Sequence, residues 1–145
     1  MKRIIAIAII IFSLIGCGKN PNQIIGTIIN ISDDAYLPYS IEGKPSGIWH
    51  PSEEIIKKAN PVIFQYINDS SKEIFRNIDL YRCQYFGIII KGKKRLYCNF
   101  FRLTAYEKDW RTNPVVVFDG GNCYFQLEYD IETGKCLNFS INGEA

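Results

Sequence analysis

The residues of this chain best suited to chemistry are its cysteines and its single histidine. Four of the five cysteines, Cys83, Cys98, Cys123 and Cys136, lie in the second half of the sequence. A thiolate activated by a histidine is the nucleophile of Cys-His hydrolases, and His50 is the only histidine that could serve such a dyad. No recognised nucleophile motif surrounds any of these cysteines, so a hydrolase or thiol enzyme using His50 is an alternative interpretation and not the leading one.

Other catalytic and metal-binding patterns do not occur in the sequence. It contains no Gly-x-Ser-x-Gly elbow, phosphate loop or dinucleotide fingerprint. The paired carboxylates Asp33-Asp34 and Glu53-Glu54 are adjacent in sequence, which is typical of solvated loops and helix starts, whereas acid-base catalysis needs convergent carboxylates. The wide cysteine spacing does not match a structural zinc site. We therefore expect no cofactor, no metal and no enzymatic activity.

The N-terminus carries an export signal. Lys2 and Arg3 precede an apolar run, Ile4–Ile15, that ends in Leu14-Ile15-Gly16-Cys17, the pattern of a signal peptide. The tetrad resembles the lipobox of bacterial lipoproteins. The resemblance implies that Cys17 becomes the first mature residue, with a diacylglyceryl group on its sulfur and an acyl chain on its amine.

A single transmembrane helix is the alternative for this segment. The apolar run is interrupted by Ser13 and ends at Gly16, short of the roughly 20 residues that span a bilayer. Two or more acyl chains attach a protein to the membrane effectively permanently. We expect a lipid-anchored protein of the cell envelope, and Gly18, in place of an aspartate, favours the outer membrane facing the periplasm if the organism has two membranes.

The remaining chain is expected to form one domain. We divide the sequence into a signal peptide (1–16), a lipidated tether (17–23) and a single domain (24–145), and the mature chain has 129 of the 145 residues. Of the 17 Lys and Arg residues, Lys2 and Arg3 leave with the signal peptide, so 15 basic residues balance 15 acidic ones. Nucleic-acid binding is not expected, because it requires a marked basic excess.

The even number of cysteines that remain after Cys17 predicts disulfides in an exported protein. Three pairings are open, with free buried thiols as the alternative. Cys98 with Cys123 is the best single guess, because residues 98 and 123 would face each other if the loop between their strands is centred near residue 110.

Helical signals come first and strands follow. Pro51, two glutamates and an apolar stripe predict a helix, kinked near Asn60 or split by Pro61. Ser70 and Glu73 match the capping box of a short second helix. The strands are expected at 24–31 (an edge strand or a segment packed across the domain), 80–90, 95–103, 122–129 and 136–141, with a hairpin turn at 91–94. The Gly120-Gly121 pair is either a hairpin turn or a β-bulge.

This order predicts an α+β fold, in which an N-terminal kinked helix or helix pair packs against a curled antiparallel meander, broadly as in cystatin-like or NTF2-like folds. Period-2 alternation places Tyr81, Cys83 and Tyr85 on one face of a strand and Gln84 and Phe86 on the other. The second face mixes polar and apolar groups, so it lines a cleft or forms a solvated sheet face.

Several short motifs are similar to those of a loose group of small uncharacterised bacterial lipoproteins: Trp49-His50-Pro51-Ser52, Tyr81–Gly87, Asn99, Phe101, Trp110, Asp119-Gly120-Gly121, Tyr124-Phe125, Tyr129-Asp130 and Asn142-Gly143. The resemblance implies a fold and a location but no activity. We take Trp49, Trp110, Asp119, Gly120 and Gly121 as candidate binding residues.

The leading functional hypothesis is a non-enzymatic binding, inhibitor or immunity-type module. It would be anchored to the membrane through lipid on Cys17 and would bind an envelope protein partner. A structural envelope lipoprotein is a further alternative, and it predicts an exposed apolar patch of more than a few hundred Å².

The anchor can be tested by intact mass spectrometry of the membrane-extracted protein. We expect loss of residues 1–16 and the added mass of diacylglycerol and a further acyl chain on Cys17. An unprocessed N-terminus without lipid would contradict the lipobox assignment.

Overall fold

The computed structural model describes residues 23–32, 42–103 and 108–144. The predicted signal peptide, the predicted lipidation site Cys17 and the predicted tether up to residue 22 lie outside the described residues. The elements are, in chain order, β1 (Gly26–Ile28), β2 (Gly47–Ile48), α1 (Glu53–Ser70), α2 (Lys72–Arg76), the 3-10 turn η1 (Ile78–Leu80), β3 (Tyr81–Ile90), β4 (Lys93–Arg102), the 3-10 turn η2 (Gly121–Cys123), β5 (Tyr124–Asp130) and β6 (Cys136–Ile141).

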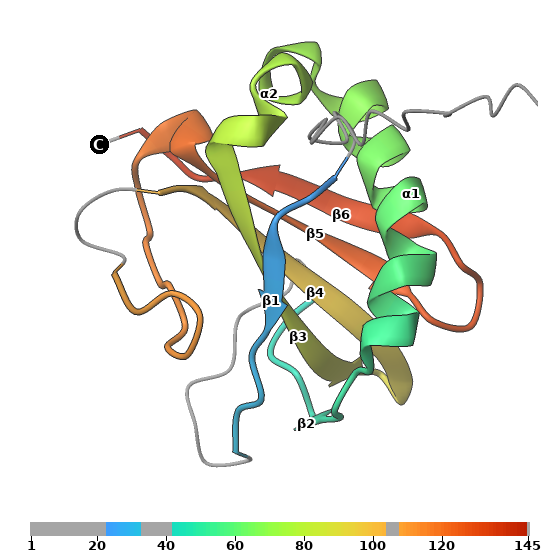
Figure 1. The fold of residues 1–145 in the computed structure, drawn as a ribbon. Helices are drawn as coiled ribbons and strands as arrows, with labels where there is room; N and C mark the ends of the chain where they lie inside the picture. Colours follow the sequence, from blue (N-terminus) through green and yellow to red (C-terminus); the bar gives the residue numbers. More distant parts are fainter. Residues whose placement is uncertain (1–22, 33–41, 104–107, 145) are drawn as a thin grey trace, which may run out of the picture.

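The fold is α+β, with one main helix against a mostly antiparallel sheet (Figure 1). Within the described residues the sheet has six strands, in the order β1-β3-β4-β5-β6, and β2 also pairs with β3. Strands β3 to β6 form the predicted antiparallel meander. The predicted fold class is therefore confirmed, and the arrangement is of the kind seen in cystatin-like and NTF2-like folds. No helix among the described residues is long and apolar enough to cross a membrane.

The central hairpin joins β3 to β4 through a two-residue turn. Lys91 and Gly92 both have positive φ, 50° and 76°, which is the backbone that a two-residue hairpin needs to match the twist of its strands. The turn is shorter than predicted, because Lys93 and Lys94 already pair with Ile90 and Ile89.

Two short strands cover the outer edge of β3. β1 runs parallel to its first half, where the Cys83 N–H donates to the Ile25 carbonyl at 3.0 Å. β2 runs antiparallel to its second half, and the Trp49 N–H donates to the Gly87 carbonyl at 3.0 Å. The predicted edge strand is thus confirmed, and it protects the long strand β3 from pairing with other chains.

The helix α1 begins at a Ser52 cap, whose hydroxyl oxygen accepts from the Ile55 N–H at 3.4 Å. Its buried stripe is Ala59, Ile63 and Ile67. The predicted alternative of two separate helices is wrong, because α1 continues through Pro61. Pro61 is exposed, so the carbonyl that loses its intrahelical partner there lies where water can reach it.

The predicted capping box of the second helix is wrong by one residue. Ser71 is the cap of α2, and its hydroxyl accepts from the Ile74 N–H at 3.3 Å. The Glu73 carboxylate, expected to complete the box, instead accepts from the Asn122 side chain at 2.9 Å. A long-range contact to η2 thus takes the place of the local one.

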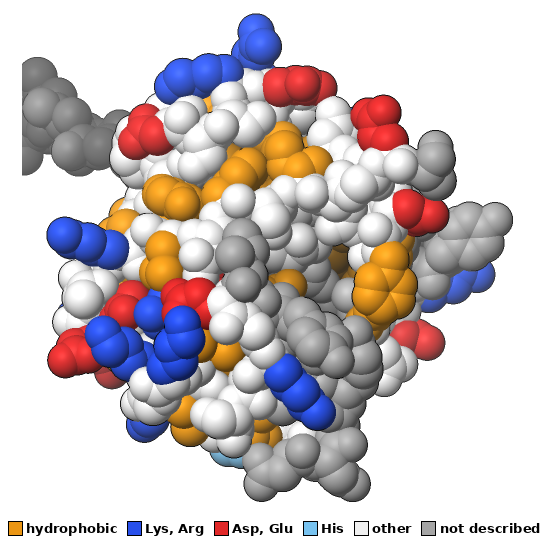
Figure 2. Space-filling view, turned by 180° about the vertical axis from the view of Figure 1, so that it is seen from behind, with side chains coloured by type: hydrophobic (Ala, Val, Ile, Leu, Met, Phe, Trp, Pro, Cys, Tyr) orange, Lys and Arg blue, Asp and Glu red, His pale blue; other side chains and the backbone are white. Residues whose placement is uncertain are grey.

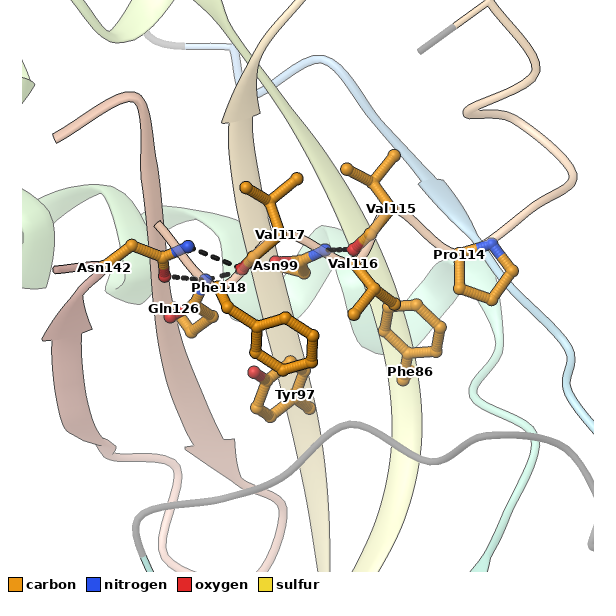
Figure 3. Close-up of a pocket in the computed structure, with 10 residues that line it drawn as sticks. All are labelled: Phe86, Tyr97, Asn99, Pro114, Val115, Val116, Val117, Phe118, Gln126 and Asn142. Atoms are coloured by element: carbon orange, nitrogen blue, oxygen red, sulfur yellow. Dashed lines mark hydrogen bonds between the residues drawn. The ribbon is translucent and has the colours of Figure 1, made fainter. Parts of the chain in front are cut away.

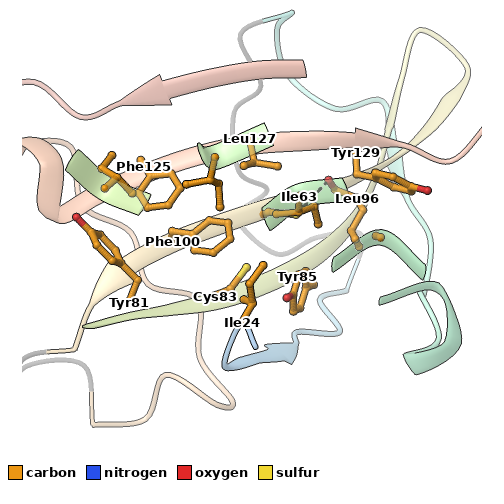
Figure 4. Close-up of a cluster of buried hydrophobic side chains, with 14 residues drawn as sticks. Ile24, Ile63, Tyr81, Cys83, Tyr85, Leu96, Phe100, Phe125, Leu127 and Tyr129 are labelled. Carbon is orange, nitrogen blue, oxygen red and sulfur yellow. Dashed lines mark hydrogen bonds between the residues drawn. The ribbon is translucent and has the colours of Figure 1, made fainter. Parts of the chain in front are cut away.

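The main core lies between α1 and the sheet (Figure 4). As the alternation predicts, Tyr81, Cys83 and Tyr85 point into it and are fully buried. The rings of Phe100 and Phe125, from neighbouring strands, stack with their centroids 4.5 Å apart. Helix and sheet are also joined by a hydrogen bond in which the Tyr85 hydroxyl donates to Asn60 Oδ1 at 2.7 Å.

The segment from Trp49 to Pro51 packs directly against Gly87 of β3, and a substitution at Gly87 tests how much this close contact stabilises the fold. A Cβ at Gly87 would overlap the Trp49 carbonyl oxygen and lie 2.9 Å from Pro51 Cδ. We expect Gly87→Ala to lower the free energy of unfolding by about 3 kcal/mol, measured by urea unfolding, because backbone must move to admit the methyl group. Gly143→Ala, where nothing lies within 4 Å of the new Cβ, is the matched control, and equal stability of the two variants would contradict this account.

Candidate functional site

The face of the sheet opposite α1 is crossed by an irregular segment. Residues 110–119, which we call the strap, run between β4 and β5 in sequence and contain no helix or strand. Because the strap forms neither a helix nor a β-ladder, its backbone N–H and C=O groups need hydrogen-bond partners from other parts of the molecule. They find them in a set of side-chain amides on the sheet.

These amides form a straight row across the strands. Gln84 on β3 is the register partner of Asn99 on β4, Asn99 that of Gln126 on β5, and Gln126 that of Ser140 on β6. Asn99 Nδ2 donates to Gln84 Oε1 at 3.4 Å, and Gln126 Nε2 donates to Asn99 Oδ1 at 3.4 Å. The Ser140 hydroxyl closes the row by donating to Gln126 Oε1 at 3.3 Å. We call Gln84, Asn99, Gln126 and Ser140 the amide row.

Gln84 holds the first half of the strap. Its Nε2 donates to the carbonyls of Trp110 and Asn113 at 2.6 and 2.7 Å, while its Oε1 accepts from the Val115 N–H at 2.8 Å. Asn99 Nδ2 donates to the carbonyl of the same Val115 at 2.8 Å. Gln84 is fully buried, and these bonds satisfy it completely.

Asn142, just after β6, holds the second half. Its Nδ2 donates to the Val117 carbonyl at 2.6 Å and to the Asp119 carbonyl at 3.0 Å. Its Oδ1 accepts from Gln126 Nε2 at 3.1 Å, which connects it to the amide row. The strap is therefore bonded to side chains from β3, β4 and the end of β6.

Trp110 fixes the start of the strap by packing. Only 3% of the residue is exposed, and its ring meets Phe101 edge to face with the centroids 5.8 Å apart. The Arg111 guanidinium lies 4.5 Å from the ring centroid. Trp110 therefore has a structural role, although the sequence made it a candidate binding residue.

A pocket of about 190 Å³ opens between the strap and the sheet (Figure 3). It is lined by Phe86, Tyr97, Asn99, Pro114, Val115, Val116, Val117, Phe118, Gln126 and Asn142. The Phe86 and Tyr97 rings meet edge to face, 6.2 Å apart. In Figure 3 the side chains of Val116 and Phe118 point toward these rings, and those of Val115 and Val117 point away from them. Phe118 is 81% exposed, so its ring forms an accessible rim.

The alternative of a solvated sheet face is wrong, and Phe86 from this mixed face lines the pocket. Gln84, Phe86 and Ile88 are buried. The sequence signal for this site is that an amide side chain stands among apolar and aromatic residues in each of three consecutive strands: Gln84, Asn99 and Gln126. Sequence alone does not bring Gln84 together with Asn99, Gln126 and Asn142, because their alignment depends on the register between strands.

The predicted binding residues do not meet in this pocket. Trp49 lies at the edge of the sheet, where its indole N–H is shared between the carbonyls of Ile88 and Arg95 at 3.1 and 3.0 Å. Asp119, Gly120 and Gly121 border a different hollow beside Glu144. Trp49 and Trp110 are thus structural positions, and none of the five predicted residues lines the pocket.

The glycine pair is neither a hairpin turn nor a β-bulge. Gly120 adopts a left-handed conformation with φ 88° and caps η2, the 3-10 turn that leads into β5. A Cβ at Gly120 would lie 2.6 Å from the Tyr124 ring. Glycine is therefore required there for conformation and for close packing.

All four cysteines of the described domain are free thiols, so no predicted disulfide is formed in this structure. The expectation that Cys98 and Cys123 face each other is wrong: Cys98 pairs with Leu127, and Cys123 belongs to η2. Burial raises the pKa of the Cys98 thiol well above its ordinary value, and burial raises the pKa of Cys136 to about 12. Both thiols are therefore protonated at neutral pH.

His50 stands apart from these thiols. It is exposed, and its Nδ1 lies 3.2 Å from Asn30 Oδ1. Cys83 and Cys98 are buried in the core on the α1 side of the sheet. The arrangement does not provide the hydrogen-bonded thiol and imidazole that a Cys-His nucleophile requires.

A buried ionic cluster ties β4 to β5. The Arg95 guanidinium lies 3.3 Å from Asp130 and 3.6 Å from both Glu128 and Glu42. Burial raises the pKa of Asp130, but two N–H groups of the following turn and the Arg95 charge lower it more, so the carboxylate stays ionised. A second cation, Lys91, lies 3.2 Å from Glu42, so two basic side chains face the three carboxylates of this cluster.

Acidic and basic side chains are also mixed at the surface. In the view from behind, Lys and Arg lie next to Asp and Glu, and hydrophobic side chains reach the surface at several places (Figure 2). Among the described residues, no group of three or more His, Cys, Asp or Glu side chains is placed to hold a metal ion.

Comparisons with protein-family models, curated proteins and solved structures find no match to this chain. Function therefore has to be argued from the site itself.

Proposed function

We propose that this chain is a non-enzymatic, lipid-anchored binding module of the cell envelope, of the inhibitor or immunity type. Its pocket would receive an apolar side chain of a partner protein. The observation that carries the proposal is the pocket beneath the strap, which the largely buried Phe86 and Tyr97 rings line beside the exposed ring of Phe118. Protein interfaces concentrate their binding energy in such aromatic pockets.

The size of the pocket suits one side chain. An apolar cavity of about 150 Å³ accommodates benzene, and this pocket has about 190 Å³. It is too small to enclose most drug-sized ligands, whose pockets begin near 300 Å³. An anchor residue from a protein surface fits it better than a complete small-molecule substrate.

The rigidity of the pocket also supports binding. Its floor lies on the central strands β3 and β4, and its wall is fixed to them by the bonds of Asn99 and Asn142 to the strap. A preformed site loses little conformational entropy on binding. The high pKa values of the Cys98 and Cys136 thiols and the separation of His50 from them make the thiol-enzyme alternative the weaker proposal.

A site-specific photocrosslinker tests the proposal in the native membrane. We expect p-benzoylphenylalanine in place of Phe118 to give one discrete adduct with an envelope protein, identified by mass spectrometry. Val62 on α1, which is 37% exposed, provides the matched control position. The same adducts at both positions, or repeated failure to recover any adduct at Phe118 from folded protein, would count against the proposal.

A further inference from the structure

We propose that the pocket selects an aromatic group that carries a single hydrogen-bond donor and no acceptor, which among side chains is the indole of tryptophan. This inference rests on the proposed function and specifies which partner residue enters the pocket. It follows from an account of the donors and acceptors that the lining amides still have available.

The amide donors of the pocket are all in use. Asn99, Gln126 and Asn142 each have one NH₂ group with two N–H donors. Asn99 Nδ2 donates to Gln84 Oε1 and to the Val115 carbonyl. Gln126 Nε2 donates to the side-chain oxygens of Asn99 and Asn142. Asn142 Nδ2 donates to the carbonyls of Val117 and Asp119. No amide N–H of these three side chains is left for a ligand.

The orientation of these amides is fixed by their surroundings. Backbone carbonyls can only accept hydrogen bonds, so the nitrogen ends of Asn99 and Asn142 must face the carbonyls of the strap. Their oxygen ends then face Gln126, which must present its nitrogen to both. Turning any one amide over would place two acceptors or two donors against each other.

Acceptor capacity remains. A side-chain carbonyl oxygen has two lone pairs, and Asn99 Oδ1 and Asn142 Oδ1 each receive one hydrogen bond, both from Gln126. Both side chains line the pocket and lie along one side of it, with the Tyr97 and Phe86 rings on the other (Figure 3). The three amides therefore offer hydrogen-bond acceptors and no free N–H, beside the aromatic rings of Phe86 and Tyr97.

Charged ligands do not match this lining. Among the described residues around the pocket, none carries a formal charge, and burial of an uncompensated charge is costly. A carboxylate or phosphate would also need donors that the amides cannot supply. A phenol brings acceptor lone pairs along with its donor, whereas an indole is a donor only. The ring of an indole can pack against Phe86 and Tyr97 in the offset or edge-to-face geometry that aromatic rings prefer.

Small probes test this selectivity on the mature lipidated protein in nanodiscs, with free probe concentrations fixed by equilibrium dialysis. Methyl resonances of Val115, Val116 and Val117 report binding by NMR. We expect indole to bind saturably, N-methylindole to bind about fivefold more weakly because it lacks the donor, and p-cresol, benzoate and benzylammonium to bind more weakly than indole. Phe118→Ala should weaken indole binding, and Val62→Ala should not.

Equal affinity for indole and N-methylindole, stronger binding of p-cresol, benzoate or benzylammonium, or no saturable shift with indole would overturn the inference. The two proposals fail separately. A crosslinked partner at Phe118 without preference for indole rejects the donor selectivity alone, and preference for indole without any crosslinked partner rejects the protein partner alone.

Discussion

The amide row is the interaction on which the open face of this molecule depends. Gln84, Asn99 and Gln126 lie side by side on three neighbouring strands and bond to one another and, through Gln84 and Asn99, to the backbone of the strap. Without these amides the strap would leave buried backbone groups without partners, each at a cost of about 1–3 kcal/mol. The pocket exists because the row holds the strap across the sheet at a fixed position.

The segments that cover the two faces of the sheet are attached to it by different interactions. On the helix side, apolar packing dominates, and one hydrogen bond from Tyr85 to Asn60 fixes α1. On the strap side, a short irregular segment cannot bury enough apolar surface, so polar side chains supply the attachment. Polar networks of this kind rigidify a structure only when every member is satisfied. Because the amide N–H groups are all bonded within the network, the amides present only hydrogen-bond acceptors to the pocket.

Local patterns predicted the elements well, and contacts between elements account for the errors. The last strand, the hairpin and the two faces of β3 follow from composition and period-2 alternation. The pairing of Cys98 with Leu127 depends on η2, which the Gly120-Gly121 pair did not reveal. The site was missed for the same reason, because Gln84, Asn99 and Gln126 become a row only through the register of three strands. Trp49 and Trp110 were predicted as binding residues, but their indoles serve internal hydrogen bonds and packing.

Hydrogen exchange of the strap tests the central claim most directly. In the wild-type protein the Val115 N–H, bonded to Gln84 Oε1 at 2.8 Å, should be protected. We expect Gln84→Leu, and the milder Asn142→Ala, to remove protection from residues 110–119 while β3 and β4 stay protected, because the strap loses its bonds and the main core keeps its packing. Ser140→Ala, which removes only the bond at the far end of the row, should leave the strap unchanged. Undiminished strap protection in Gln84→Leu and Asn142→Ala would show that the amide row does not hold the strap.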